Sequence, residues 1–208
     1  MSVFDELAQA GSATAHEASG RGGVVDCDLV QLLPGSRAAG PARTVHCGQD
    51  DNLMVHAAMA ELEPGEVLVV TMPEARPVAL LGELLATQAK HRGAAAVLVD
   101  AAVRDAEELV ELGLPVWARW VRVRGATKRI VGTLGEPVEM GGTTIRPGDA
   151  VVLDADGAVV VPRDRVEEVA IACGERLENE RVKRAQLQAG ALSYDLDGLR
   201  DLVERPST

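Results

Sequence analysis

The chain has 208 residues, a hydrophobic fraction of 47% and a formal net charge of −11. We find no internal repeat and no clear linker, so we expect a single domain over residues 1–208. Aromatic residues make up only 2% of the chain, which disfavours base stacking, and the acidic charge disfavours binding to a phosphate backbone. We therefore expect no nucleic-acid partner and a protein that handles small molecules.

The sequence shows no sign of membrane insertion or export. No segment approaches the roughly 20 apolar residues of a membrane-spanning helix, and the first residues include Asp5 and Glu6 instead of a long apolar run. We expect no membrane partner and a cytoplasmic location. The cysteines form no Cys-x-x-Cys pair, so we interpret them as small buried side chains and predict neither a zinc site nor a disulfide framework. They are Cys27, Cys47 and Cys173.

The N-terminal quarter predicts two helices and a strand. A short helix is expected over residues 3–11, with Ser2 as its N-cap. The polar stretch 12–18 leads to a glycine-rich loop at 19–23, which could cradle an anion but is more often a flexible turn. A strand is expected within 35–47. Asp50 or Asp51 is the expected cap of a second helix, whose apolar residues have helical spacing: Met54, Val55, Ala58, Met59 and Leu62.

The middle of the chain alternates buried strands with helices. Residues 67–71 form a continuous apolar run, typical of a strand buried on both faces. A proline-interrupted loop over 72–80 precedes a helix that opens at Gly82 and closes at Gly93. The further expected elements are a strand at 94–99, a helix at 106–112 and a strand at 115–118. This alternation indicates a parallel α/β layer.

The C-terminal third has a different pattern. From 122 to 162 the chain is rich in Gly, Pro, Val and Ile, which predicts β-hairpins with turns at 141–142, 147–149 and 154–157. Residues 154–157 also resemble the start of a calcium loop, but the downstream glutamate is missing. Asp164 is the expected cap of a long helix ending near Ala189. Its charged part, 175–184, is either a solvated face or a segment that reaches a neighbouring subunit. A small amphipathic helix is expected over 194–204.

Two segments suggest a binding site. Arg104 and Asp105 follow a buried strand, and α/β sheets bind ligands outside the carboxyl ends of their strands. The helix that opens at Gly82 offers free N–H groups at residues 83–85, which can bind an anion. Arg104 can bind a carboxylate through two hydrogen bonds, and Asp105 is a hard oxygen ligand suited to Mg²⁺ or Mn²⁺. One small oxyacid and one divalent cation would fit this arrangement.

Simpler interpretations exist for each of these residues. Arg104 and Asp105 could form a loop ion pair, and Glu83 could be a first-turn acid favoured by the helix dipole. Glu180 could lie on a solvated helix face. His56 alone is typical of a structural or surface histidine, and Lys128 could be an exposed loop lysine.

The motifs in combination resemble a known family. Residues 82–85, 104–105, 147–149 and 156–162 are similar to the family of regulator of ribonuclease activity A, and the resemblance covers nearly the whole chain. Further segments resemble its 4-carboxy-4-hydroxy-2-oxoadipate aldolase branch: 51–52, His56, 115–117, 125–128, 179–180 and 194–200. Two positions depart from the aldolases, which have Asp where this chain has Glu83 and Trp where it has Leu53. These departures bear on the substrate more than on the reaction class.

The resemblance implies a fold and an activity. The fold would be α/β, with a β/β/α core like that of a swivelling phosphohistidine domain, a parallel α/β layer and a long C-terminal helix. The protein would form homotrimers or homohexamers with active sites between subunits. The implied activity is a class II, divalent-metal-dependent retro-aldol cleavage of a 4-hydroxy-2-oxo acid to pyruvate and a second oxo acid, with oxaloacetate decarboxylation as a side activity. The substrate would be of the 4-carboxy-4-hydroxy-2-oxoadipate or 4-hydroxy-4-methyl-2-oxoglutarate type.

The resemblance also implies roles for individual residues. Asp105 would hold Mg²⁺ or Mn²⁺, assisted through water by Glu83 and by Glu180 of a neighbouring subunit. Catalysis would fall to Arg104, Asp105 and Glu83. The amides of Gly82, Glu83, Leu84 and Leu85 would bind the pyruvate carboxylate, with Arg104 on the pyruvyl group. Asn52, His56 and Lys128 would meet the distal carboxylates of the oxo-acid substrate.

Retro-aldol chemistry is consistent with these residues. The reaction needs a base for the C4 hydroxyl and an electron sink for the pyruvate enolate. No lysine shows the apolar surroundings that activate a Schiff base, so a metal sink is favoured. Arg104 would add charge stabilisation of about 3 kcal/mol. The alternatives are a non-catalytic regulator of RNA degradation and a related lyase of another pathway. Methyl transfer is disfavoured because the nucleotide-binding fingerprint is missing.

Overall fold

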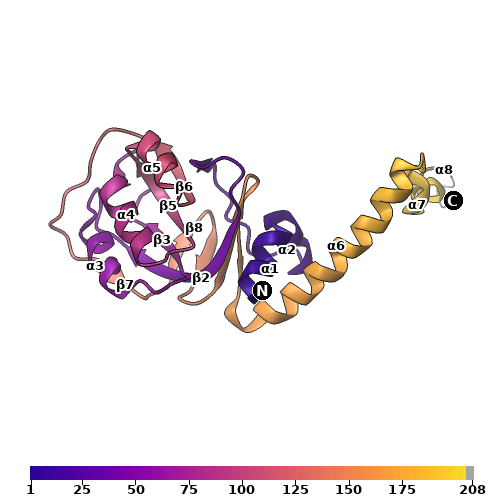
Figure 1. Cartoon of the computed structure of the whole chain (residues 1–208), viewed down its shortest axis with the longest axis horizontal. Helices are drawn as coiled ribbons and strands as arrows, with labels where there is room; N and C mark the ends of the chain where they lie inside the picture. The colour runs from indigo at the N-terminus through magenta and orange to yellow at the C-terminus, as the bar shows by residue number, and fades with distance from the viewer. Residues whose placement is uncertain (205–208) are drawn as a thin grey trace.

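The computed structural model describes residues 1–204 and shows a mixed α/β fold with a curled sheet and a long C-terminal helix (Figure 1). Within the described residues the main sheet has nine strands, in the order β1-β6-β5-β3-β2-β10-β11, with β4 beside β5 and β7 beside β2. Its centre consists of four mutually parallel strands: β2 Ala38–His46, β3 Val67–Thr71, β5 Ala96–Val103 and β6 Val116–Val121. The remaining strands are β1 Val30–Gln31, β4 Ala79–Leu81, β7 Thr133–Leu134, β10 Ala150–Asp154 and β11 Gly157–Val161.

Both faces of the parallel layer are buried, which explains its continuous apolar runs. Along β3, Leu68 and Val70 face one cluster of apolar side chains, whereas Val67 and Val69 face the other. Three helices cover the first face (Figure 1): α3 Leu53–Glu61, α4 Glu83–His91 and α5 Ala106–Leu112. A separate hairpin contributes to the second cluster, and its strands are β8 Val138–Met140 and β9 Thr143–Ile145.

A third apolar cluster joins the sheet to the N- and C-terminal helices. It packs α1 Val3–Ala10, α2 Ser12–Ala18 and the first turns of α6 Val166–Gln188 against β10 and β11. The rest of α6 projects away from the body as an arm (Figure 1). The arm ends in two short helices, α7 Ser193–Leu196 and α8 Leu199–Glu204, and an ion pair of 2.6 Å from Lys183 Nζ to Asp197 Oδ1 ties α7 to it. Among the described residues, no helix combines the length and apolar character needed to cross a bilayer.

Most expected elements are confirmed, including Ser2 as the N-cap of α1, where the structure adds a capping box with Asp5, and the hairpin turns at 141–142 and 154–157. The expected cap of the second helix was wrong: the N-cap of α3 is Asn52, which makes no side-chain capping bond. Asp51 lies just before it and accepts a hydrogen bond from the Leu53 N–H at 2.9 Å. Asp154 is a hairpin residue, as expected, and accepts a hydrogen bond from the Asp156 N–H. Cys47 and Cys173 are buried and Cys27 is partly buried, all three as free thiols.

Several boundaries were wrong. Residues 12–18 form helix α2 because buried contacts at Ser12 and Ala15 override a weak apolar pattern. Strand β5 starts at Ala96 and continues to Val103, because its last residues pair with β4. Strand β4 itself, Ala79–Leu81, lies mostly in a stretch that was expected to be a loop. Residues 122–132 contain no strand of the described sheets. The next strand, β7 at 133, pairs with β2, and the first hairpin begins with β8 at 138.

Two predictions near the C-terminus also need correction. Asp164 lies inside a 3₁₀ turn, Arg163–Arg165, and α6 begins without a side-chain cap. The expected helix over 194–204 is broken into α7 and α8 at Gly198, whose positive φ of 67° interrupts the helical backbone. The likeness to a swivelling phosphohistidine domain stays a prediction.

Candidate active site

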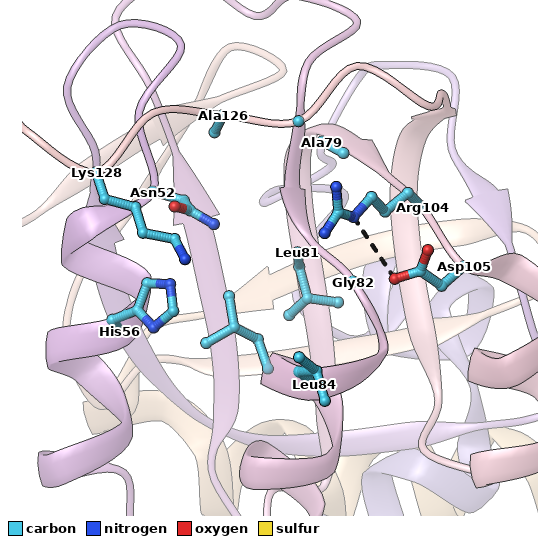
Figure 2. Close-up of a pocket in the computed structure, with 12 residues that line it drawn as sticks. Asn52, His56, Ala79, Leu81, Gly82, Leu84, Arg104, Asp105, Ala126 and Lys128 are labelled. Atoms are coloured by element: carbon cyan, nitrogen blue, oxygen red, sulfur yellow. Dashed lines mark ion pairs between the residues drawn. The ribbon is translucent and has the colours of Figure 1, made fainter.

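A cavity of about 210 Å³ lies at the carboxyl ends of β4 and β5 (Figure 2). This is the edge at which α/β sheets bind ligands. Its lining combines a few polar groups with small apolar side chains: Asn52, His56, Ala79, Leu81, Gly82, Leu84, Leu85, Arg104, Asp105, Gly125, Ala126 and Lys128. It is smaller than the roughly 300–1,000 Å³ of drug-sized pockets, so its size suits a small oxyacid.

Asp105 has an unusual backbone that directs its carboxylate to the site. It directly precedes α5 with φ 59° and ψ 49°, the left-handed region that non-glycine residues rarely adopt. Its side chain makes no capping bond to α5. Instead, Oδ2 accepts a hydrogen bond from the Glu83 N–H at 3.1 Å and lies 3.5 Å from Arg104 Nε. Residues in such conformations cluster at functional sites.

Gly82 lets the start of α4 approach Arg104 and Asp105 closely. A Cβ at this position would lie 2.6 Å from Asp105 Oδ2 and 3.1 Å from Arg104 Cγ. The first intrahelical bond of α4 runs from the Ala86 N–H to the Gly82 carbonyl at 3.0 Å. The N–H groups of Leu84 and Leu85 therefore have no acceptor within the helix, and they remain as donors for an anion at the pocket.

The opposite end of the pocket holds two buried polar atoms without partners. Asn52 donates through Nδ2 to the Leu80 carbonyl at 2.9 Å. Within residues 1–204, neither Asn52 Oδ1 nor His56 Nε2 has a hydrogen-bond partner. The Lys128 side chain points toward the His56 ring (Figure 2). Burial first, and then the positive charge of Lys128, lower the pKa of His56 below its ordinary value. Unsatisfied buried groups that face a cavity indicate a polar ligand.

The structure does not bring every expected residue to this pocket. Glu83 Oε1 accepts a hydrogen bond from Thr87 Oγ1 at 2.8 Å, and Glu83 does not line the cavity. Glu180 lies on the arm, where it pairs with Arg176 at 3.0 Å and borders a separate hollow together with Lys183. Within one described chain these two glutamates do not join Asp105, and their roles stay predictions.

Some lining residues were missed from the sequence. Ala79 and Leu81 belong to β4, which was mistaken for a loop although Val78 to Leu81 is an apolar run. Gly125 and Ala126 come from the segment expected to be a hairpin. Small and apolar wall residues carry no chemical signal in a sequence, so only the fold reveals them.

The carboxylates near the pocket are few, which limits how a divalent cation could bind. Among residues 1–204, no three His, Cys, Asp or Glu side chains converge as a metal cage. Of the residues that the structure describes, Asp105 alone lines the pocket with a carboxylate, and the absence of a side chain at Gly82 leaves room for it. Mg²⁺ commonly binds one or two carboxylates and completes its shell with waters and substrate oxygens. The residues present fit that mode of binding.

The fold and the pocket define an α/β protein with a small polar site at the carboxyl edge of its parallel strands. The chain belongs to the RraA-like family, whose model, described as Aldolase/RraA, matches residues 3–160. A relative from Halalkalibacterium halodurans is 34% identical over 176 residues, covering 84% of this chain and 80% of its own, and bears the name "Putative 4-hydroxy-4-methyl-2-oxoglutarate aldolase".

Solved structures resemble most of the fold. Streptomyces coelicolor RraAS2, described as an unusual member of the RNase ES inhibitor RraA protein family, is 31% identical with a TM-score of 0.78 and covers 88% of this chain and 95% of its own. A Geobacillus kaustophilus protein named S-adenosylmethionine: 2-dimethylmenaquinone methyltransferase is 34% identical with a TM-score of 0.64, over 68% of this chain and 87% of its own. Relatives with aldolase names support a lyase.

Proposed function

We propose that the protein is a divalent-metal-dependent lyase that cleaves a 4-hydroxy-2-oxo acid to pyruvate and a second oxo acid. The observation that carries this proposal is the meeting of Arg104, Asp105 and the free amides of α4 in one small pocket. The substrate would be of the 4-hydroxy-4-methyl-2-oxoglutarate or 4-carboxy-4-hydroxy-2-oxoadipate type. Oxaloacetate decarboxylation would be a second activity because it passes through the same pyruvate enolate.

The residues of this chain would divide the work along the substrate. The N–H groups of Leu84 and Leu85 bind the pyruvyl carboxylate, whose charge the positive end of the α4 dipole favours. The Arg104 guanidinium stabilises the negative charge that develops on the C2 oxygen as the C3–C4 bond breaks. A cation held at Asp105 would supply Lewis-acid polarisation of the 2-oxo group. Glu83, or Glu180 of a neighbouring subunit, takes the C4 hydroxyl proton through a water.

The end of the pocket formed by Asn52, His56 and Lys128 would bind the part of the substrate beyond the pyruvyl unit. The Lys128 ammonium attracts a distal carboxylate, and His56, whose pKa is lowered by burial and by Lys128, stays neutral at pH 7 and can donate or accept a hydrogen bond. The unpartnered Oδ1 of Asn52 can accept from a substrate hydroxyl. These groups would make the pocket selective for longer oxyacids over pyruvate itself.

The first experiment measures pyruvate release from oxaloacetate by the purified protein, with Mg²⁺, with Mn²⁺ and with EDTA. We expect a metal-dependent rate that EDTA abolishes. Asp105→Asn keeps the size of the side chain but removes its charge, and we expect kcat to fall by about 100-fold or more. Arg104→Lys keeps the charge but loses the two-pronged geometry, so it should also lower kcat.

A matched control comes from the same strand. Asp100 on β5 pairs with Arg119 at 3.3 Å and does not line the pocket. Asp100→Asn keeps the size of the side chain at a position outside the pocket, so the rate of pyruvate release per folded molecule should stay at the wild-type value. Full activity of Asp105→Asn with Mg²⁺ would refute the assigned site, and no pyruvate release with either metal would refute the lyase.

A second function is favoured by the likeness to RraAS2, which is described as belonging to a family of ribonuclease inhibitors. In that case the chain would act by binding a component of an RNA-degradation complex, without metal or catalysis. A pull-down with a purified endoribonuclease of the RNase E type, together with a cleavage assay, tests this function. Inhibition that survives in Asp105→Asn, in a protein without lyase activity, would decide for the regulator.

Methyl transfer, the activity for which the Geobacillus protein is named, is not favoured here. A cavity of about 210 Å³ lies below the roughly 300 Å³ at which pockets begin to hold drug-sized ligands such as a nucleoside cofactor.

A further inference from the structure

Residues 122–132 connect β6 to β7 without regular structure and border the candidate pocket. They contribute Gly125, Ala126 and Lys128 to its lining (Figure 2). The segment is otherwise open to solvent, with Val123 92% and Val131 77% exposed. A loop with so little apolar burial needs polar contacts to hold one conformation.

The contacts that hold this segment concentrate around Asp51. In the backbone, the Asn52 N–H donates to the Thr127 carbonyl and the Thr127 N–H donates to the Asp50 carbonyl, both at 2.9 Å. In addition, Asp51 Oδ2 accepts from Thr127 Oγ1 at 2.5 Å and from the Arg129 N–H at 2.6 Å. Thr127 and Arg129 are the residues on either side of Lys128. One carboxylate therefore holds the side chain of Thr127 before the lysine and the backbone N–H of Arg129 after it.

Helix capping does not account for this arrangement. Asn52, not Asp51, is the N-cap of α3, and only one of the Asp51 side-chain bonds, from the Leu53 N–H to Oδ1, involves that helix. Asp51 is 0% exposed, and burying a carboxylate is costly unless hydrogen bonds replace its hydration. Burial opposes ionisation, but the donors at Thr127, Leu53 and Arg129 outweigh it and hold the pKa of Asp51 below its usual value. The Asp51 carboxylate is thus charged at pH 7, and it bonds both the first residue of α3 and the segment 122–132.

We propose that Asp51 is a positioning residue that fixes the Lys128 ammonium at the distal end of the pocket and thereby sets selectivity for substrates with a carboxylate beyond the pyruvyl unit. The inference rests on the proposed lyase function. Asp51 does not line the cavity, and its side-chain bonds do not reach Gly82, Arg104 or Asp105. Removing the Asp51 carboxylate should therefore weaken binding of the distal substrate carboxylate and leave binding of the pyruvyl unit unchanged.

The test compares Asp51→Asn with wild type. The Asn side chain has the same volume as Asp. An NH₂ group in place of Oδ2 cannot accept the hydrogen bond from the Arg129 N–H, because both groups are donors. We expect KM for 4-carboxy-4-hydroxy-2-oxoadipate to rise about tenfold or more, with a smaller change in kcat, while inhibition by pyruvate stays within about twofold of wild type. Hydrogen exchange at the Arg129 amide should quicken.

Two further variants separate positioning from general damage. Asp50→Asn changes the neighbouring carboxylate, which bonds Gln49 and faces Arg76, and should behave as wild type. Lys128→Ala should raise KM like Asp51→Asn, and the double variant should be no worse than Lys128→Ala alone, because Asp51 acts through Lys128. If Asp51→Asn does not fold, Thr127→Val removes one of the same bonds and replaces it in the series.

Additive effects in the double variant, an equal loss of pyruvate inhibition, or unchanged KM in Asp51→Asn would overturn the inference. A wild-type protein that releases no pyruvate from any of these acids would instead refute the lyase function, and with it the selectivity. The hydrogen-exchange measurement tests separately whether Asp51 holds residues 122–132 in place. Unchanged protection of the Arg129 amide in Asp51→Asn would show that it does not.

Discussion

Asp105 illustrates how much a single backbone conformation decides. With a right-handed or extended backbone its carboxylate would take another direction, and the 3.1 Å contact with the Glu83 N–H would be lost. The sequence placed Asp105 after a buried strand and Gly82 before a helix, which sufficed to expect both at one edge of the sheet. It did not predict that Glu83 would turn its side chain to Thr87, because a rotamer depends on neighbours that the pattern does not name.

At the residue scale we predict a pKa change at His56. Burial and the Lys128 charge both disfavour the imidazolium, so the folded pKa lies below its unperturbed value of about 6.5. Removing the charge in Lys128→Ala should raise the pKa of His56, while burial, the larger cause, keeps it below the unperturbed value. NMR titration of the imidazole Cε1–H, assigned with His56→Gln, measures the shift.

The control for this titration is Lys90→Ala. Lys90 lies in the last turn of α4, where its ammonium donates to the carbonyl of Leu112 at the end of α5. It does not border the pocket. Its removal should leave the His56 titration unchanged. A His56 pKa that falls or stays constant in Lys128→Ala would show that the two side chains do not interact.

At the element scale, periodicity located the interior strands and amphipathic helices well and the connecting elements poorly. The strand β3 and helix α5 match their expected bounds, because local burial sets their patterns. Helix α2 was missed because its stability comes from a distant partner. Ser12 donates to Asp154 from its N–H at 2.8 Å and from Oγ at 2.6 Å, across 142 residues of sequence.

This link predicts a stability effect. Ser12→Ala removes a buried bond to a carboxylate and should lower the free energy of unfolding by about 1–3 kcal/mol, measured by urea denaturation. Ala13→Ser is the reverse exchange at the exposed neighbouring position and should cost no more than about 0.5 kcal/mol. Equal costs for the two variants would mean that the contact between Ser12 and Asp154 contributes nothing measurable.

At the scale of the whole molecule, the arm is hard to explain in an isolated chain. Large apolar side chains of α6 and of the segment beyond it are exposed, including Ile171 at 65%, Val182 at 47%, Leu192 at 57% and Leu202 at 73%. Exposed apolar residues grouped on one extended element commonly mark an interface. The sequence resemblance implied a homotrimer or homohexamer, and the arm gives this prediction a physical basis.

We predict that sedimentation velocity at micromolar concentration finds a trimer or hexamer. The double substitution Ile171→Glu and Val182→Glu places charges on exposed positions of α6 and should shift the protein toward smaller species. Gln186→Glu adds one charge to the same helix at an exposed polar position and should leave the distribution unchanged. A wild-type monomer at these concentrations would contradict the prediction.

The sequence by itself determined the parallel α/β layer, the long final helix, the family and the pairing of a glycine turn with Arg104 and Asp105. These features follow from local periodicity and from motifs at strand ends, which a linear pattern encodes directly. Only the tertiary structure decided that Asp51 bonds Thr127 across 76 residues of sequence and that Glu180 pairs with Arg176 on α6 beside a hollow separate from the pocket of its own chain. The reason is physical: a hydrogen bond between distant segments depends on how whole elements pack, and no local pattern records it.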